Sequence, residues 1–127
     1  MEKLKKIELE YSINTIPKIL YYRLSNPSGL EEWFAKKVTL ENEIFTFKWS
    51  QSEQQAKLIS KKTDSFIRFK WLDDEQEYTY FEFSIHEQEL TGDVAIKIID
   101  FAEPDEIDDI TGMWTEQIEG LKHTLGV

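Results

Sequence analysis

The sequence predicts an α+β fold in which a curved, seven-stranded antiparallel sheet wraps around one long C-terminal helix. Two observations carry this prediction. The 127-residue chain reads as one strand, two short helices and six further strands. Its end carries a single amphipathic helical stripe. Because each strand has one apolar and one polar face, the sheet needs a cover on one side only, and the long helix is the one element able to provide it.

The first part of the chain predicts one strand and two short helices. Apolar and polar residues alternate over residues 3–13, as in a half-buried strand. Asn14-Thr15 offers a capping side chain ahead of a helix over residues 16–25, which has an apolar stripe and a proline in its first turn. Pro27 interrupts that helix. A second short helix is expected over residues 28–35.

Six strands are expected in the middle of the chain. Phe45, Phe47 and Trp49 alternate with polar residues, and the same period of two recurs in the other segments. The links between them are short and rich in turn-forming residues, so neighbouring strands should pair as antiparallel hairpins. The expected strands cover residues 37–41, 44–50, 54–62, 65–72, 77–88 and 92–101.

A long helix is expected over residues 104–126. Its apolar residues fall within an arc of about 80° and would run for about 34 Å, enough to lie across seven strands. Acidic residues crowd its first turns, and Lys122 and His123 lie near its end, which suits the helix dipole. The apolar stripe consists of Ile107, Ile110, Trp114, Ile118, Leu121 and Leu125.

Two glycines, Gly112 and Gly120, lie on the outer side of this helix. Each costs about 1 kcal/mol relative to alanine. Tolerated glycines, a kink, or close approach of a second chain in a homodimer would each account for them. We expect Gly112→Ala to stabilise the monomer.

Composition and charge exclude several classes of function. The net charge is −10, which argues against sequence-independent nucleic-acid binding. Residues 1–72 contain 13 basic and 9 acidic side chains, whereas residues 73–127 contain 2 and 16. The absence of cysteine excludes disulfides and thiolate chemistry. The length of the chain suits a single domain over residues 1–127. No apolar run is long enough for a membrane span and no signal core opens the chain, so a cytoplasmic protein is expected.

Motifs for metals, cofactors and hydrolytic catalysis are missing from the sequence. His86 and His123 are the only histidines, and neither has a second histidine at ligand spacing, so both are interpreted as surface residues and no metal or cofactor is predicted. The acidic runs near Asp74 and Asp105 do not match a calcium loop. They are interpreted as a polar turn and as a helix start that suits the dipole.

A curved sheet and a straight helix do not match everywhere, so a gap between them is a candidate ligand cavity. Asp100 continues the inward phase of the last strand, where it would either anchor a ligand or cap a neighbouring backbone group. Tyr80 is a second candidate polar anchor. The inward aromatic residues would either line the cavity or fill the core. The candidate ligand-binding residues are Phe47, Trp49, Phe69, Trp71, Phe83, Ile96, Asp100, Trp114 and Ile118.

Several stretches resemble one family. They are Pro17-Lys18-Ile19-Leu20-Tyr21-Tyr22, Leu30-Glu31-Glu32-Trp33-Phe34-Ala35, Phe45-Thr46-Phe47-Lys48-Trp49, Phe69-Lys70-Trp71, and Met113-Trp114 followed by Leu121 and Leu125. On these the chain resembles the START-like (SRPBCC) helix-grip superfamily, which includes birch-pollen-allergen-like proteins and polyketide cyclases. It is most similar to the bacterial branch related to the activator of a heat-shock-protein ATPase. Asp100-Phe101-Ala102-Glu103 replaces the glycine-phenylalanine loop of that branch, so no loop function is carried over.

Three functions remain open at this point. The first is a non-enzymatic domain that binds a small hydrophobic or amphipathic molecule, lipid-like or aromatic, flanked by Trp114 and Ile118. The second is a protein-interaction or co-chaperone-like module with a filled core, whose acidic second half would favour a basic partner. The third, a cyclase-type enzyme, needs an acid–base pair that the sequence does not place, so no catalytic residue is assigned.

Overall fold

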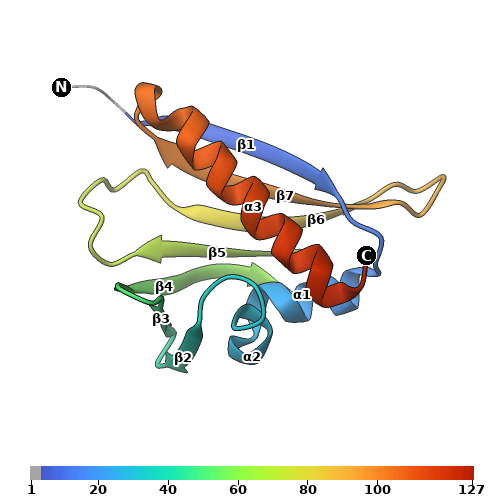
Figure 1. The fold of residues 1–127 in the computed structure, drawn as a ribbon, viewed down its shortest axis with the longest axis horizontal. Coiled ribbons are helices and arrows are strands. Elements are labelled where there is room, and N and C mark those ends of the chain that lie inside the picture. Colours follow the sequence, from blue (N-terminus) through green and yellow to red (C-terminus); the bar gives the residue numbers. More distant parts are fainter. Residues whose placement is uncertain (1–3) are drawn as a thin grey trace.

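The computed structural model describes residues 4–127, which form one seven-stranded antiparallel sheet with a long helix lying across one face (Figure 1). The strand order is β1-β7-β6-β5-β4-β3-β2. This confirms the predicted α+β helix-grip architecture. The elements are β1 (Lys5–Ser12), α1 (Pro17–Ser25), α2 (Pro27–Leu30), β2 (Lys37–Glu41), β3 (Ile44–Lys48), β4 (Glu53–Lys62), β5 (Phe66–Trp71), β6 (Phe81–Glu87), β7 (Val94–Ala102), a 3-10 turn η1 (Pro104–Glu106) and α3 (Ile107–Leu125).

Strands β2 to β7 follow one another as antiparallel hairpins, and β1 pairs with β7 to form the other edge of the sheet. The short α1 and α2 therefore connect the two opposite edges of the sheet, as Figure 1 shows. In the β1–β7 register Ile7 is opposite Asp100 and Leu9 is opposite Ile98. This pairing fixes the end of β7 that carries Asp100, which matters for the site described below.

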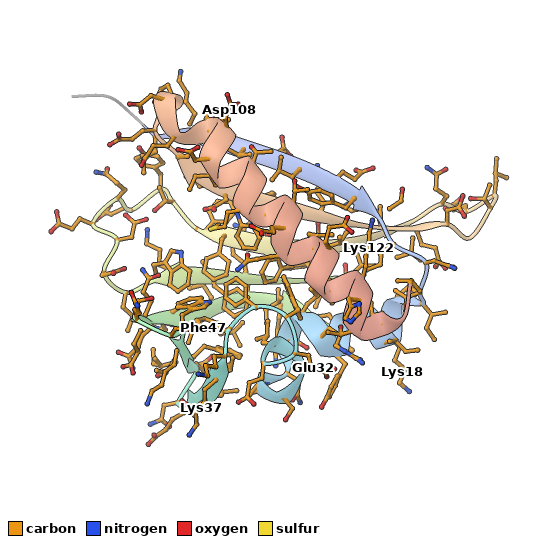
Figure 2. All side chains as sticks on the ribbon, in the orientation of Figure 1. Lys18, Glu32, Lys37, Phe47, Asp108 and Lys122 are labelled. Carbon is orange, nitrogen blue, oxygen red and sulfur yellow. The ribbon has the colours of Figure 1, made fainter. Side chains whose placement is uncertain are left out.

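The core lies between the sheet and α3, and it contains the predicted inward faces. Phe45 and Phe47 of β3 are buried, as are Ile96 and Ile98 of β7. The alternation predicted from the sequence is therefore correct for these strands. Trp114, Ile118 and Leu121 bury the central part of the α3 stripe against them, while Ile107, Ile110 and Leu125 are only partly buried. Figure 2 shows the Phe47 ring within the dense group of side chains beside α3, whose two ends are marked by Asp108 and Lys122.

The structure differs from the sequence-based expectation at α1. The helix begins at Pro17 with Ile16 at the cap position, and no side chain caps it. The Asn14-Thr15 cap is therefore wrong. Asn26 is the residue that caps, because its Oδ1 accepts a hydrogen bond of 3.0 Å from the Ser28 backbone N–H at the start of α2. Regular helix in α2 also ends earlier than expected, at Leu30, and turns follow it.

The strand expected over residues 77–88 begins only at Phe81. The β5–β6 ladder ends at the Phe69–Phe81 pair. Beyond it, the Lys70 ammonium donates 2.9 Å and 2.8 Å hydrogen bonds to the carbonyl and hydroxyl oxygens of Thr79. The Lys70 side chain thus binds the Thr79 carbonyl oxygen, which a longer β5–β6 ladder would have used. The β5–β6 connection therefore leaves the sheet as an irregular loop.

The helices give no sign of a membrane span. Within residues 4–127, none is both long and apolar enough to cross a bilayer.

Candidate functional site

A pocket of about 520 Å³ lies beneath the N-terminal half of α3. It is bounded by that helix, the β5–β6 connection, the segment between β3 and β4, and the end of β7, which meet at one end of the sheet (Figure 1). A second depression of similar size lies near the other end of α3, but no aromatic ring lines it. The first pocket is lined by Phe34, Trp49, Ser52, Gln54, Trp71, Asp74, Thr79, Tyr80, Asp100, Phe101, Ile110, Met113, Trp114 and Gln117.

Aromatic rings held by one another form the inner wall of the pocket. The Phe34 ring stacks on Trp114 with ring centroids 5.8 Å apart and meets Trp49 edge-on at 5.7 Å. The Trp49 indole N–H also donates a 2.8 Å hydrogen bond to the Phe34 carbonyl oxygen. At the other side, Phe101 packs against Tyr80 with centroids 5.3 Å apart. Rings in mutual contact keep their orientation, so this apolar wall is largely preformed.

Asp100 supplies the polar point of the pocket next to α3. Its Oδ2 accepts a 2.9 Å hydrogen bond from the Trp114 indole N–H, and its Oδ1 accepts one of 2.8 Å from the Phe101 backbone N–H. No Lys, Arg or His among residues 4–127 forms an ion pair with it. Burial raises the pKa of Asp100, the two hydrogen bonds oppose that shift, and the nearby charge of Asp74 adds to it. Asp100 caps the Phe101 N–H, which is one of the two roles expected from the sequence. It also lines the pocket, and the other expected role, anchoring a ligand, stays a prediction.

Asp74 lies on the loop side of the pocket and is held differently. Its carboxylate accepts hydrogen bonds from the Thr79 hydroxyl and, at 2.9 Å, from the Gln76 backbone N–H. The Lys70 ammonium lies 3.9 Å away. This cluster fixes the β5–β6 connection as the outer wall of the pocket. The Asp74 carboxylate has the Lys70 ammonium beside it, whereas the Asp100 carboxylate has no such partner among residues 4–127.

We expect Asp100→Asn to be more stable than the unchanged protein near neutral pH. A carboxyl group whose pKa is raised by folding is ionised less readily in the folded state, so ionisation costs folding free energy. The advantage of the variant should be absent in acid, grow as the pH rises above the ordinary Asp value of 3.8, and level off above the raised pKa. Urea denaturation of both proteins across this range measures it. The exposed Asp108→Asn is the control, and equal pH profiles of the two variants would contradict the role of burial.

The structure brings together four of the nine candidate residues. Trp49, Trp71, Asp100 and Trp114 line the pocket, as does Tyr80. The other five are fully buried, and none of them lines it: Phe47, Phe69, Phe83, Ile96 and Ile118. They belong to the buried core cluster that also contains Trp114 and Leu121 of α3, so their placement at a cavity wall is corrected to the core.

The expected flank at Ile118 is wrong for a related reason. The helix contributes Ile110, Met113, Trp114 and Gln117, so the pocket is displaced toward the start of α3. Phe34, Ile110 and Met113 line the pocket but are not among the candidate ligand-binding residues predicted from the sequence. The adjacent aromatic residues Trp33 and Phe34 were the available signal for Phe34.

The histidines lie outside this pocket. His86 is exposed, with its Nε2 3.2 Å from the Ser84 hydroxyl, and His123 is exposed near the end of α3. Within residues 4–127, no group of three His, Asp or Glu side chains is arranged to hold a metal ion.

Solved structures share this architecture. BfR322 from Bacteroides fragilis is 43% identical, with 98% of this chain and 93% of that chain covered and a TM-score of 0.70. The Aha1 dimer from Colwellia psychrerythraea is 15% identical over 93% of each chain, with a TM-score of 0.79. DynU16, from the dynemicin biosynthetic locus, is 8% identical, with 96% of this chain and 47% of that chain covered and a TM-score of 0.76. At such low identities the last two show the fold alone.

Sequence comparison gives the family directly. No protein with a curated description matches the chain. The family model of the START-like superfamily domain matches residues 1–127, the full length of the sequence. The chain therefore belongs to the START-like superfamily.

Proposed function

We propose that this protein is a non-enzymatic binding domain that holds a small amphipathic molecule, aromatic or lipid-like, beneath the N-terminal half of α3. The observation that carries the proposal is the pocket of about 520 Å³, with aromatic walls and the Asp100 carboxylate at its polar point. Small-molecule sites typically have volumes of about 300–1,000 Å³, mostly apolar walls and a few placed polar groups. The helix lying over the sheet, which leaves this pocket between them, is the arrangement of the START-like fold to which the chain belongs.

The apolar walls would supply most of the binding free energy. Burial of apolar ligand surface contributes about 25 cal/mol per Å². Trp49, Trp71 and Trp114 present large rings to the pocket. Trp49 and Trp114 pack on Phe34, and Trp71 packs on Phe81, so little ordering is needed when a ligand enters. Asp100 would then orient the ligand, because a buried acceptor favours the pose that brings a donor to it.

The site geometry gives less support to an acid–base enzyme. Such a mechanism needs two groups that can exchange protons with the substrate. In the part of the chain that the structure describes, residues 4–127, Asp74 and Asp100 are the only carboxyl groups that line the pocket. Asp74 is engaged by Thr79 and Lys70, which leaves Asp100 without a second free carboxyl group for such a pair.

Binding can be tested with the protein purified gently from its host cell. Native mass spectrometry is expected to show a mass above that of the bare chain, and a library of lipids and aromatic amphiphiles is expected to contain compounds that raise the melting temperature. Met113→Trp should block the pocket mouth, because Met113 lines it and is partly exposed. The affinity for such a compound should fall at least about tenfold, since a ring would occupy the ligand's place.

The matched control is Glu119→Trp, which puts the same ring on an exposed position of α3 that does not line the pocket. It should leave binding unchanged. A bare-chain mass together with no thermal shift across the library would overturn the proposed function. Equal losses in both tryptophan variants would show that the ligand binds elsewhere.

A further inference from the structure

We infer that the ligand of this pocket is an organic cation, such as an ammonium group attached to a hydrophobic body. The inference rests on the proposed function and adds the charge of the ligand to it. It is carried by the charges of the lining residues, by the environment of Asp100 and by the aromatic walls.

The charges that line the pocket have one sign. Among the described residues 4–127, two lining residues, Asp74 and Asp100, are acidic, and none is Lys, Arg or His. Lys70 pairs with Asp74 from outside the lining. Asp100 accepts two hydrogen bonds but has no ion-pair partner in the described part of the chain, residues 4–127. A half-buried carboxylate without a counter-charge is costly, and a bound cation beside it would supply the missing charge.

The walls suit a cation as well as a hydrophobic body. Aromatic faces attract cations by about 0.5–2 kcal/mol, with Trp the best of the rings. Three Trp residues line this pocket. The lining residue Tyr80 already makes such a contact from outside the pocket lining, where the Arg68 guanidinium lies 4.0 Å from the centre of its ring. An ammonium group in the pocket would therefore meet both aromatic faces and the Asp100 carboxylate.

An anionic ligand would meet the opposite conditions. A fatty acid or other carboxylate would place a like charge beside Asp100 and Asp74, with no basic lining residue to offset it. The 16 acidic against 2 basic side chains in residues 73–127, which include α3 and the β5–β6 connection, would also oppose its approach. The pocket therefore selects by charge as well as by size.

Three probes of nearly the same shape separate charge from hydrophobicity: phenyltrimethylammonium, neutral tert-butylbenzene and anionic benzenesulfonate. The readout is the set of tryptophan indole N–H signals in a proton–nitrogen NMR spectrum. Trp114 donates to Asp100 and reports directly on that carboxylate, and Trp49 and Trp71 report on the walls. Trp33, whose indole N–H donates to the Arg23 carbonyl oxygen outside the pocket lining, is the internal control.

We expect the cation to shift the Trp49, Trp71 and Trp114 signals at the lowest concentration, with an affinity about tenfold above that of the anion, and to leave Trp33 in place. If the neutral or the anionic probe binds as tightly as the cation, the charge inference is overturned while the proposed function stands. If none of the three probes shifts the pocket signals, the charge inference is overturned, while the proposed function is decided separately by the native mass and the library.

Variants test the contact itself. Asp100→Asn keeps the size of the side chain and an acceptor for Trp114, so the cation should lose about tenfold in affinity while tert-butylbenzene keeps its own. Asp108→Asn removes the same charge from an exposed position on α3 outside the pocket, and it should leave the affinities for the cation and for tert-butylbenzene unchanged. An unchanged affinity of Asp100→Asn for the cation, or an equal loss in Asp108→Asn, would overturn the role of Asp100.

Discussion

Replacement of Phe34 by alanine should lower the free energy of unfolding by about 3–5 kcal/mol, the range for a large aromatic residue removed from a packed core. Phe34 is 4% exposed and stands at the centre of the aromatic cluster. Its ring centroid lies within 6.2 Å of six other aromatic rings, those of Trp33, Phe47, Trp49, Phe81, Phe83 and Trp114. The large loss is expected because these neighbours belong to the sheet, to α3 and to the segment after α2, and cannot all move into the space that the ring leaves.

The backbone role of Phe34 would survive the substitution. Its carbonyl oxygen would still accept the hydrogen bond from the Trp49 indole, so the loss should report the ring alone. Urea denaturation followed by far-ultraviolet circular dichroism measures the change. Phe66→Ala is the matched control, since it removes the same atoms from a half-buried side chain on β5 whose neighbour Ile67 points into the core. Should the two variants lose equal stability, the central position of Phe34 in the core would be refuted.

The strands of this fold were predictable because their information is local. In an alternating pattern, every second side chain lies on the same face of the sheet, and a slip of one residue would turn all of the inward ones outward. Phe45 and Phe47, or Ile96 and Ile98, therefore indicate strand, face and register together. The same phase placed Asp100 toward α3, and the structure has its carboxylate on the Trp114 indole.

The pocket was less predictable because its walls depend on contacts between distant residues. The β5–β6 connection leaves the sheet where the Lys70 side chain binds Thr79, a hydrogen bond that no periodicity encodes. The α3 stripe indicated which face of the helix is buried. It did not indicate which turn of α3 lies beside the pocket. The sequence therefore predicted a pocket next to Ile118, whereas the structure has it next to Ile110 and Met113.

Replacement of Gly29 by alanine should destabilise the protein by up to about 3 kcal/mol, although Gly29 lies within α2 and alanine is the better helix former. An added Cβ would lie 2.3 Å from the Tyr22 carbonyl oxygen and 2.8 Å from the Arg23 Cα, both backbone atoms of α1. Neither can rotate away, so α1 would have to shift as a unit. That shift would also strain the 2.8 Å hydrogen bond from the Trp33 indole to the Arg23 carbonyl oxygen.

The opposite outcome is expected for Gly112→Ala, which makes the same chemical change in α3. Apart from the adjacent residues and the backbone of α3 itself, no atom of the described residues lies within 4 Å of the position that its Cβ would occupy, so only helix propensity remains and the variant should gain about 1 kcal/mol. Thermal and urea denaturation of both variants, measured on the monomer, compare the two directly. A gain at Gly29 would show that α1 and α2 are not in close contact, and a loss at Gly112 would show that its exposed face is used. Because the residue change is identical, the difference in sign isolates the backbone contact between α1 and α2 from intrinsic helix preference.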